Sequence, residues 1–215
     1  MSHVRIKICG LTREEDVTAA VAAGADVLGF VFTQSPRQIS SDTAKDLLAC
    51  VPDGILRVGL FLNQDRSEID RVIDSVPLDA LQFHGSECEA DCKVYGLPWL
   101  KAVAMESGDS VKQAESDYPG AMGLLLDSHK SGKRGGSGKV FDWSLAAQVS
   151  KPVWLAGGLH AGNVGQAIRA VRPFAVDVSS GVEAEPGIKD AARIAAFVRA
   201  VKDVEDEEQM VARDE

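Results

Sequence analysis

The chain has 215 residues, of which 45% are hydrophobic and 26% are charged. This length and composition are typical of one globular domain and exclude a chain that is disordered throughout. The formal net charge of −9 disfavours a protein that binds the phosphate backbone of nucleic acids. Residues 203–215 carry six of the nine net negative charges, so the rest of the chain is close to neutral.

No apolar stretch approaches the roughly 18 residues of a membrane span. Arg5 and Lys7 interrupt the segment where a signal peptide would have its apolar core. We therefore expect a cytoplasmic protein that does not enter a membrane, with its four cysteines reduced. Cys88 and Cys92 have helical spacing but no second Cys/His pair follows them, so we expect no metal site there.

Short apolar runs alternate with longer amphipathic runs along the chain. In chain order they predict strand Val4–Cys9, helix Arg13–Ala23, strand Asp26–Phe32, helix Ser41–Cys50, strand Arg57–Leu62, helix Arg66–Ser75, strand Ala80–Phe83, helix Glu87–Tyr95, strand Trp99–Val103, helix Ser110–Ser116, strand Gly123–Leu126, strand Val153–Ala156, helix Ala161–Ala170, strand Phe174–Val178 and helix Ile188–Val201. Thr12 and Glu15 have the spacing of a capping box for the first helix.

Eight strand–helix units with short connections predict an α/β fold, a single-domain (β/α)8 TIM barrel over residues 1–202. The alternative is a doubly wound open sheet, which would need a glycine-rich phosphate turn after the first strand. The first strand instead ends in Cys9-Gly10-Leu11-Thr12. We expect residues 203–215 to form an acidic, disordered tail.

Active sites of such barrels lie at the C-terminal ends of the strands. A thiol and a carboxyl group lie at the C-terminal ends of two of the predicted strands: Cys9 is the last residue of the first, and Asp127 directly follows the sixth. Such a pair can act as base and acid in proton transfer. Glycine and serine turns follow strands seven and eight, where these barrels usually bind phosphate. The turn residues are Gly157, Gly158, Ser179, Ser180 and Gly181. The alternative is that both are plain tight turns.

The glycine-rich run at 135–138 does not have the spacing of a nucleotide-binding P-loop. The basic segment from His129 to Lys139 suits a lid that closes over an anionic substrate. The alternative is a surface loop without a role in the reaction.

A series of short motifs occurs in order between about residue 3 and residue 202. They are Lys7-Ile8-Cys9-Gly10-Leu11-Thr12, Gly29-Phe30-Val31-Phe32, Ser35-Pro36-Arg37, Leu81-Gln82-Phe83-His84-Gly85, Leu126-Asp127-Ser128, Gly135-Gly136-Ser137-Gly138 with Phe141-Asp142-Trp143, Leu155-Ala156-Gly157-Gly158-Leu159 and Asp177-Val178-Ser179-Ser180-Gly181-Val182-Glu183. Together they resemble the phosphoribosylanthranilate isomerase family of tryptophan biosynthesis.

The resemblance implies a TIM barrel that needs no cofactor or metal. The reaction converts N-(5-phosphoribosyl)anthranilate to 1-(o-carboxyphenylamino)-1-deoxyribulose 5-phosphate, so the expected partner is a small phosphoribosyl substrate. It implies that Cys9 is the general base, that Asp127 is the general acid and that Arg37 binds the anthranilate carboxylate. The glycine and serine turns would bind the phosphate. Whether the protein is a monomer or a homodimer stays open.

Two other functions stay open. Indole-3-glycerol-phosphate synthase is a related phosphate-binding barrel, but it uses Lys and Glu at its strand ends. A barrel that binds a phosphosugar without catalysis is the other alternative.

Charged residues of the barrel interior could support the site. Side chains alternate along a strand, so Lys7 should point into the barrel with Cys9, close to Asp177 on strand eight. We therefore regard Lys7 and Asp177 as candidate supporting residues, although this pair could merely complete the core. His84, which directly follows the fourth predicted strand, is a third candidate. Because a free thiol is mostly protonated and a free aspartate mostly ionised at pH 7, we expect positive charge to lower the pKa of Cys9. We expect burial to raise the pKa of Asp127.

Overall fold

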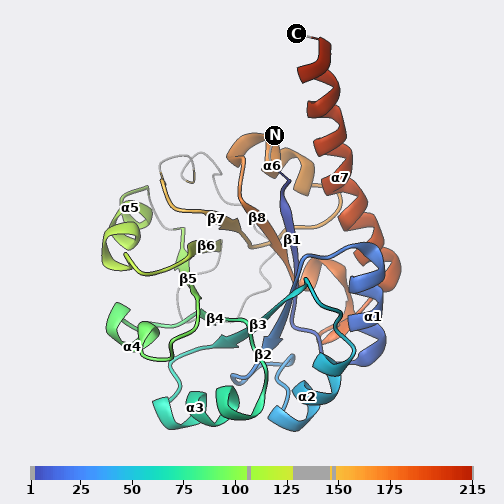
Figure 1. The fold of residues 1–215 in the computed structure, drawn as a ribbon. Helices are drawn as coiled ribbons and strands as arrows, with labels where there is room; N and C mark the ends of the chain where they lie inside the picture. Colours follow the sequence, from blue (N-terminus) through green and yellow to red (C-terminus); the bar gives the residue numbers. More distant parts are fainter. Residues whose placement is uncertain (1–2, 106–107, 128–145, 147–148, 215) are drawn as a thin grey trace.

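The computed structural model describes residues 3–105, 108–127, 146 and 149–214. Eight parallel strands follow one another around a closed ring, and β8 pairs with β1 (Figure 1). A closed ring has no sheet edge, which rules out the open doubly wound sheet and confirms the predicted (β/α)8 barrel.

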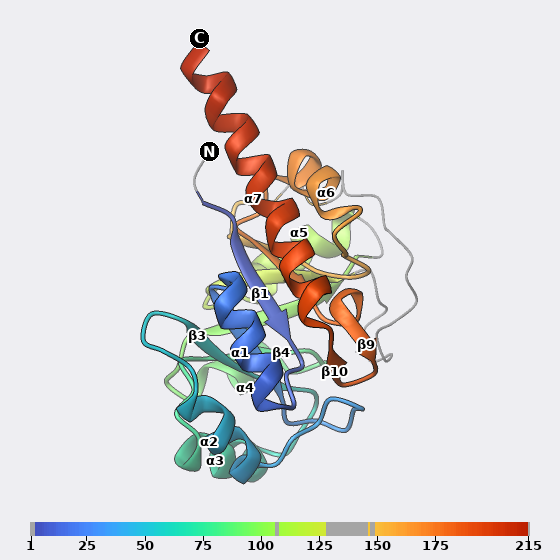
Figure 2. The ribbon, with the colours of Figure 1, turned by 90° about the vertical axis from the view of Figure 1, so that its right-hand side faces the viewer.

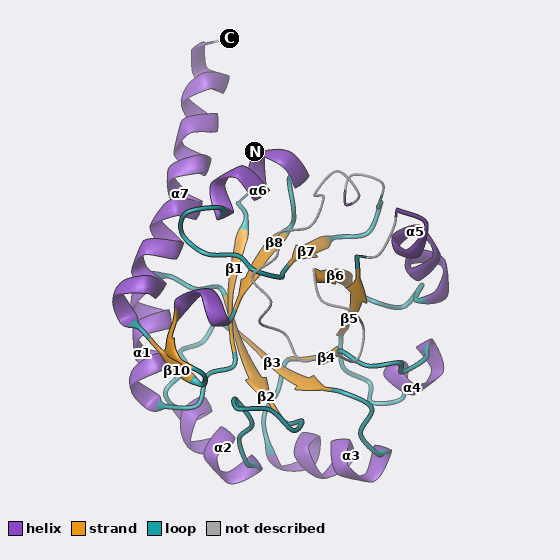
Figure 3. Ribbon diagram, turned by 180° about the vertical axis from the view of Figure 1, so that it is seen from behind, coloured by secondary structure: helices purple, strands orange, loops and turns teal. Residues whose placement is uncertain are grey.

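The barrel strands lie within one residue of their predicted bounds. They are β1 (Arg5–Cys9), β2 (Val27–Val31), β3 (Leu56–Phe61), β4 (Ala80–Phe83), β5 (Trp99–Ala104), β6 (Gly123–Asp127), β7 (Val153–Leu155) and β8 (Ala175–Val178). The helices outside the ring are α1 (Glu14–Ala23), α2 (Ser41–Ala49), α3 (Arg66–Ser75), α4 (Glu89–Lys93), α5 (Gly108–Asp117), α6 (Val164–Val171) and α7 (Ala191–Asp214) (Figure 3). Across the described ranges, no helix combines the length and apolar character needed to cross a membrane.

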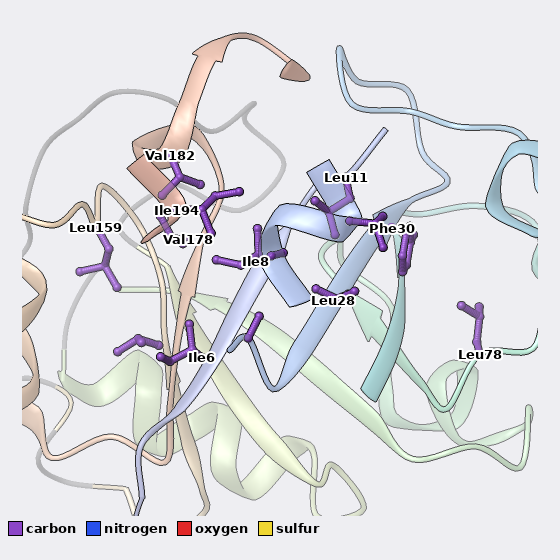
Figure 4. Close-up of a cluster of buried hydrophobic side chains, with 14 of the residues drawn as sticks. Ile6, Ile8, Leu11, Leu28, Phe30, Leu78, Leu159, Val178, Val182 and Ile194 are labelled. Atoms are coloured by element: carbon purple, nitrogen blue, oxygen red, sulfur yellow. The ribbon is translucent and has the colours of Figure 1, made fainter. Parts of the chain in front are cut away.

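The strand residues divide the hydrophobic core into an outer and an inner layer. Ile6 and Ile8 of β1 pack outward with Phe30 and Val178, in the layer between the strands and the helices that also holds Ile194 of α7 (Figure 4). The inner layer fills the barrel with Val27, Val58, Ala80, Leu100, Leu125, Trp154, Ala156 and Ala175. This alternation directs the odd-numbered residues of β1, including Cys9, into the barrel.

The start of α1 differs from the prediction. The N-cap of α1 is Arg13, whose side chain makes no capping hydrogen bond. The hydroxyl of Thr12 instead donates to the carbonyl oxygen of Gly187 at 2.5 Å. The predicted capping box is therefore wrong, because a contact with a distant segment occupies the hydroxyl.

A two-stranded hairpin precedes the last helix, where the prediction began that helix at Ile188. The hairpin pairs β9 (Glu183–Glu185) with β10 (Ile188–Lys189). α7 begins only at Ala191, since the carboxylate of Asp190 accepts hydrogen bonds from the backbone N–H groups of residues 192 and 193.

α7 continues to Asp214, through the region where the sequence predicts a disordered tail. α7 packs against α1 and α6, and its last part extends beyond the end of the barrel (Figure 2). Val204 is only 2% exposed, and Glu205 accepts a hydrogen bond from the backbone N–H of Val4. Arg169 of α6 pairs with Glu207 at 2.5 Å. These contacts lie at the N-terminal end of β1, opposite the end that carries Cys9.

Candidate active site

One mouth of the barrel collects most of the predicted site residues. Cys9 ends β1 and Asp127 ends β6, so parallel strands carry both to the same end of the ring. A pocket at this end is lined by Arg37, Asp127, Asp177 and the two turns at 156–159 and 178–181. A second hollow lies outside the ring, beside α3 and α4, and is lined by none of these residues.

Cys9 is buried at the end of β1, where glycine makes room for it. Gly29 is its neighbour on β2, and a Cβ atom at that position would lie 2.8 Å from the Cys9 sulfur. Burial raises the pKa of Cys9, although Lys7 and Lys189 favour the thiolate. The expectation of a lowered pKa is therefore wrong: the positive charges are present, but desolvation outweighs them.

Lys7 and Asp177 form a buried ion pair beneath the thiol. Register pairs the two residues across β1 and β8, and Lys7 Nζ lies 3.0 Å from Asp177 Oδ1. Burial disfavours the ammonium, but attraction to Asp177 and Cys9 outweighs it and raises the pKa of Lys7. The predicted inward direction of Lys7 is confirmed, and Asp177 also reaches the pocket lining.

Asp127 lies beside His84, which follows β4. His84 Nε2 is 3.6 Å from Asp127 Oδ2, and the other ring nitrogen of His84 is 3.3 Å from Gln82 Nε2. The side chains of His84 and Asp127 are 24% and 14% exposed. An imidazole thus contacts the carboxyl group that the sequence assigns as the acid.

Arg37 follows β2 and makes a two-point ion pair with Glu183. Its Nε and Nη2 atoms donate to the two carboxylate oxygens at 2.6 Å and 2.7 Å. Burial opposes ionisation of Glu183, but the hydrogen bonds from Arg37 and the charge of Lys189 hold its pKa below the usual value. Lys189 Nζ lies 2.8 Å from Glu183 Oε1 and 3.3 Å from Ser179 Oγ.

Sequence reasoning missed the parts that Glu183 and Lys189 play here. Glu183 ends the motif at 177–183, but nothing in the sequence assigned it a role, and Lys189 lies inside the predicted helix Ile188–Val201. Burial lowers the pKa of Lys189, although Glu183 and Cys9 favour its charged form. The Pro186-Gly187 pair is typical of a turn, and this signal in the sequence could have predicted a hairpin that brings both residues together.

The two glycine and serine turns lie against each other. Gly157 and Gly158 have φ angles of 86° and 67°, in the left-handed region that favours glycine. A Cβ atom at Gly181 would lie 1.9 Å from the carbonyl oxygen of Leu159, so only glycine fits there. Phosphate binding by these turns stays a prediction. The predicted lid at 129–139 lies outside the described residues.

Comparison with known proteins identifies the family. The family model described as N-(5'phosphoribosyl)anthranilate (PRA) isomerase matches residues 6–200. The N-(5'-phosphoribosyl)anthranilate isomerase of Pseudomonas putida (strain W619) is 55% identical over 204 residues, covering 94% of this chain and 99% of that protein. The chain belongs to the phosphoribosylanthranilate isomerase family.

Solved structures of the family have the same fold. Phosphoribosyl anthranilate isomerase from Thermotoga maritima matches with a TM-score of 0.84 at 39% identity, covering 93% of this chain and 98% of that chain. A structure of phosphoribosyl anthranilate isomerase in complex with reduced 1-(o-carboxyphenylamino)-1-deoxyribulose 5-phosphate gives a TM-score of 0.81 at 38% identity, with the same coverage. The family that the motifs resemble, its isomerase activity and its place in tryptophan biosynthesis are thus confirmed.

Proposed function

We propose that the mouth of the barrel carries out the family's reaction with Cys9 as the general base and Asp127 as the general acid. The observation that supports this most is one pocket that combines Asp127, Arg37 and both glycine and serine turns, with Cys9 at the same end of the barrel. An Amadori rearrangement of N-(5-phosphoribosyl)anthranilate requires an acid and a base, together with a cation for the carboxylate and a turn that binds the phosphate.

Asp127 begins the reaction by donating a proton to the oxygen of the furanose ring. The bond from that oxygen to the anomeric carbon breaks, and the nitrogen lone pair forms the iminium. The partly buried position of Asp127 next to His84 keeps the carboxyl group close to a second group that can exchange protons.

Cys9 then removes the proton from C2′ of the open-chain sugar. The electrons of that bond neutralise the iminium and give an enolamine, which tautomerises to the ketone of the product. Because burial raises the pKa of Cys9, the thiolate is a minor form at neutral pH. Because the reaction needs the thiolate of Cys9 and the protonated form of Asp127 together, kcat/KM should stay nearly constant between the pKa values of the two groups and fall outside that range.

Binding of the substrate falls to groups other than the acid and the base. Arg37 supplies a planar cation for the carboxylate of the anthranilate ring. Gly157, Gly158 and the turn at 179–181 take the phosphate, because their tight backbone permits close approach of an anion. Loss of either reacting group should therefore leave the substrate bound.

Replacing Cys9 by serine and Asp127 by asparagine tests the assignment in a fluorescence assay of substrate consumption. Each change should lower kcat by about 10²–10⁴-fold, the usual contribution of a positioned acid or base. The double variant should lose little more than either single variant, since both stall one reaction. Cys50→Ser, which changes an exposed cysteine, is the matched control. Activity of Cys9→Ser within about threefold of wild type would show that another residue is the base.

The remaining expectations concern the setting of the reaction. We propose that no cofactor or metal takes part, because each step moves only protons that Cys9 and Asp127 can carry. Dialysis against a chelator should leave kcat/KM unchanged, and a loss restored by one metal ion would contradict this. We also propose that the enzyme acts in the cytoplasm, as a monomer or a homodimer, and analytical ultracentrifugation distinguishes the two states.

A further inference from the structure

Lys189 and Glu183 lie beside Arg37 because the β9–β10 hairpin brings them together. The register of the hairpin pairs Lys189 with Glu183, and the Lys189 ammonium lies 2.8 Å from Glu183 Oε1. Glu183 in turn holds Arg37 by two hydrogen bonds. Lys189 and Glu183 are 4% and 6% exposed. Two charged side chains are therefore buried together at the edge of the candidate site.

The hairpin is anchored to the start of α1. The backbone N–H of Lys189 donates to Asp16 Oδ2 at 3.1 Å, and Arg13 Nη2 donates to the carbonyl oxygen of Lys189 at 3.2 Å. The Thr12 hydroxyl holds the turn of the hairpin at Gly187. Figure 3 shows β10 beside α1. Both backbone polar groups of Lys189 are thus hydrogen-bonded, which fixes the position from which its side chain extends.

The contact with Glu183 leaves one edge of Arg37 available for a second carboxylate. A guanidinium has five N–H donors in a plane, and two carboxylates can bind it along different edges. Glu183 takes the edge formed by Nε and Nη2. The edge formed by Nη1 and the second N–H of Nη2 has the same two-point geometry. Arg37 lines the pocket together with Asp127.

Charge balance gives Lys189 a role in this arrangement. Arg37 and Glu183 alone form a neutral pair, which would attract a substrate carboxylate only weakly. Lys7 and Asp177 cancel in the same way. Lys189 is the cation that pairs with Glu183 from the other side. While Cys9 is a thiol, Lys189 gives the cluster of Arg37, Glu183, Lys189, Lys7 and Asp177 one net positive charge. At this depth of burial solvent screens the charges little.

We propose that Glu183 and Lys189 are positioning residues for the substrate carboxylate: Glu183 orients Arg37, and Lys189 offsets the charge of Glu183 so that Arg37 still attracts the anion. The inference rests on the proposed role of Arg37. It adds that a neutral residue at 189 would weaken recognition of the carboxyl group, while recognition of the phosphosugar would persist.

Two ligands separate these effects in binding titrations with the full chain. One is reduced 1-(o-carboxyphenylamino)-1-deoxyribulose 5-phosphate, and the other is the same molecule without its carboxyl group. The ratio of their Kd values reports the carboxylate contact alone. Any change that Lys189 transmits to the phosphate turn through Ser179 alters both Kd values and cancels in the ratio.

Lys189→Met should lower this preference for the carboxylate about tenfold, the scale of one charge-assisted contact. Adding Glu183→Gln should restore most of the preference, because the two neutral residues leave Arg37 with its full charge. A purely structural role for Lys189 predicts the reverse, since the double variant loses one more contact. Lys189→Gln serves as the neutral variant if Lys189→Met does not fold.

Arg37→Ala separates a failure of this inference from a failure of the proposed function. If Arg37→Ala lowers the preference and Lys189→Met does not, Arg37 binds the carboxylate and Lys189 has no part in it. If the double variant is no better than Lys189→Met, charge balance is not the reason. If Arg37→Ala leaves the preference unchanged, the proposed role of Arg37 is wrong and this inference falls with it.

Discussion

Replacing Val204 by alanine tests whether the end of α7 stabilises the barrel. Val204 is 2% exposed and belongs to the core cluster between the strands and the helices. It packs onto α6, where a Cβ atom at Gly165 would lie 3.2 Å from Val204 Cγ2. A disordered tail would make no such contact, so the two descriptions of residues 203–214 predict different stabilities.

The structure gives the size of the expected effect. Val204→Ala removes two buried methylene equivalents at about 0.8 kcal/mol each, and the cavity left behind adds to this loss. The free energy of unfolding should fall by about 1.5–3 kcal/mol. A loss of about 2 kcal/mol corresponds to a Tm lower by about 4–8 °C for a chain of this size.

Urea unfolding followed by circular dichroism measures this change. Asp203→Ala is the matched control, because Asp203 is exposed on the same turn of α7. The kcat/KM of both variants should equal that of wild type, since Val204 lies at the end of the barrel opposite Cys9. If Val204→Ala stays within about 0.5 kcal/mol of wild type, as surface substitutions do, the end of α7 does not pack on the barrel.

Three further predictions concern the active site. Arg37→Lys should lower kcat/KM by an amount worth about 1.5–3 kcal/mol, because lysine cannot bind a carboxylate at two points; unchanged kinetics would refute the carboxylate assignment. Lys7→Met should move the alkylation pKa of Cys9 still higher, since Lys7 opposes the effect of burial, and the pH dependence of the reaction with iodoacetamide measures it; a downward shift would contradict the electrostatic argument. Gly181→Ala should raise the KM for the phosphorylated substrate, because the added methyl group displaces the turn after β7, and an unaltered KM would show that this turn does not bind the phosphate.

The sequence by itself determined the barrel and the placement of the groups that we propose react. Apolar runs and helical periodicity are local properties, so the strands could be assigned to within one residue. The rule that sites lie at the C-terminal ends of barrel strands then selected Cys9, Asp127 and the glycine and serine turns. The inward direction of Lys7 followed from the alternation of side chains along β1.

Only the tertiary structure decided the features that depend on distant partners. The hydroxyl of Thr12 binds Gly187 instead of capping α1, and Glu205 holds the start of β1, so neither contact can be inferred from neighbouring residues. Lys189 reads as part of a helix until the hairpin places it opposite Glu183. The raised pKa of Cys9 also depends on distant segments. The sequence shows that lysines lie nearby, but the desolvation of the thiol depends on every segment that packs around it.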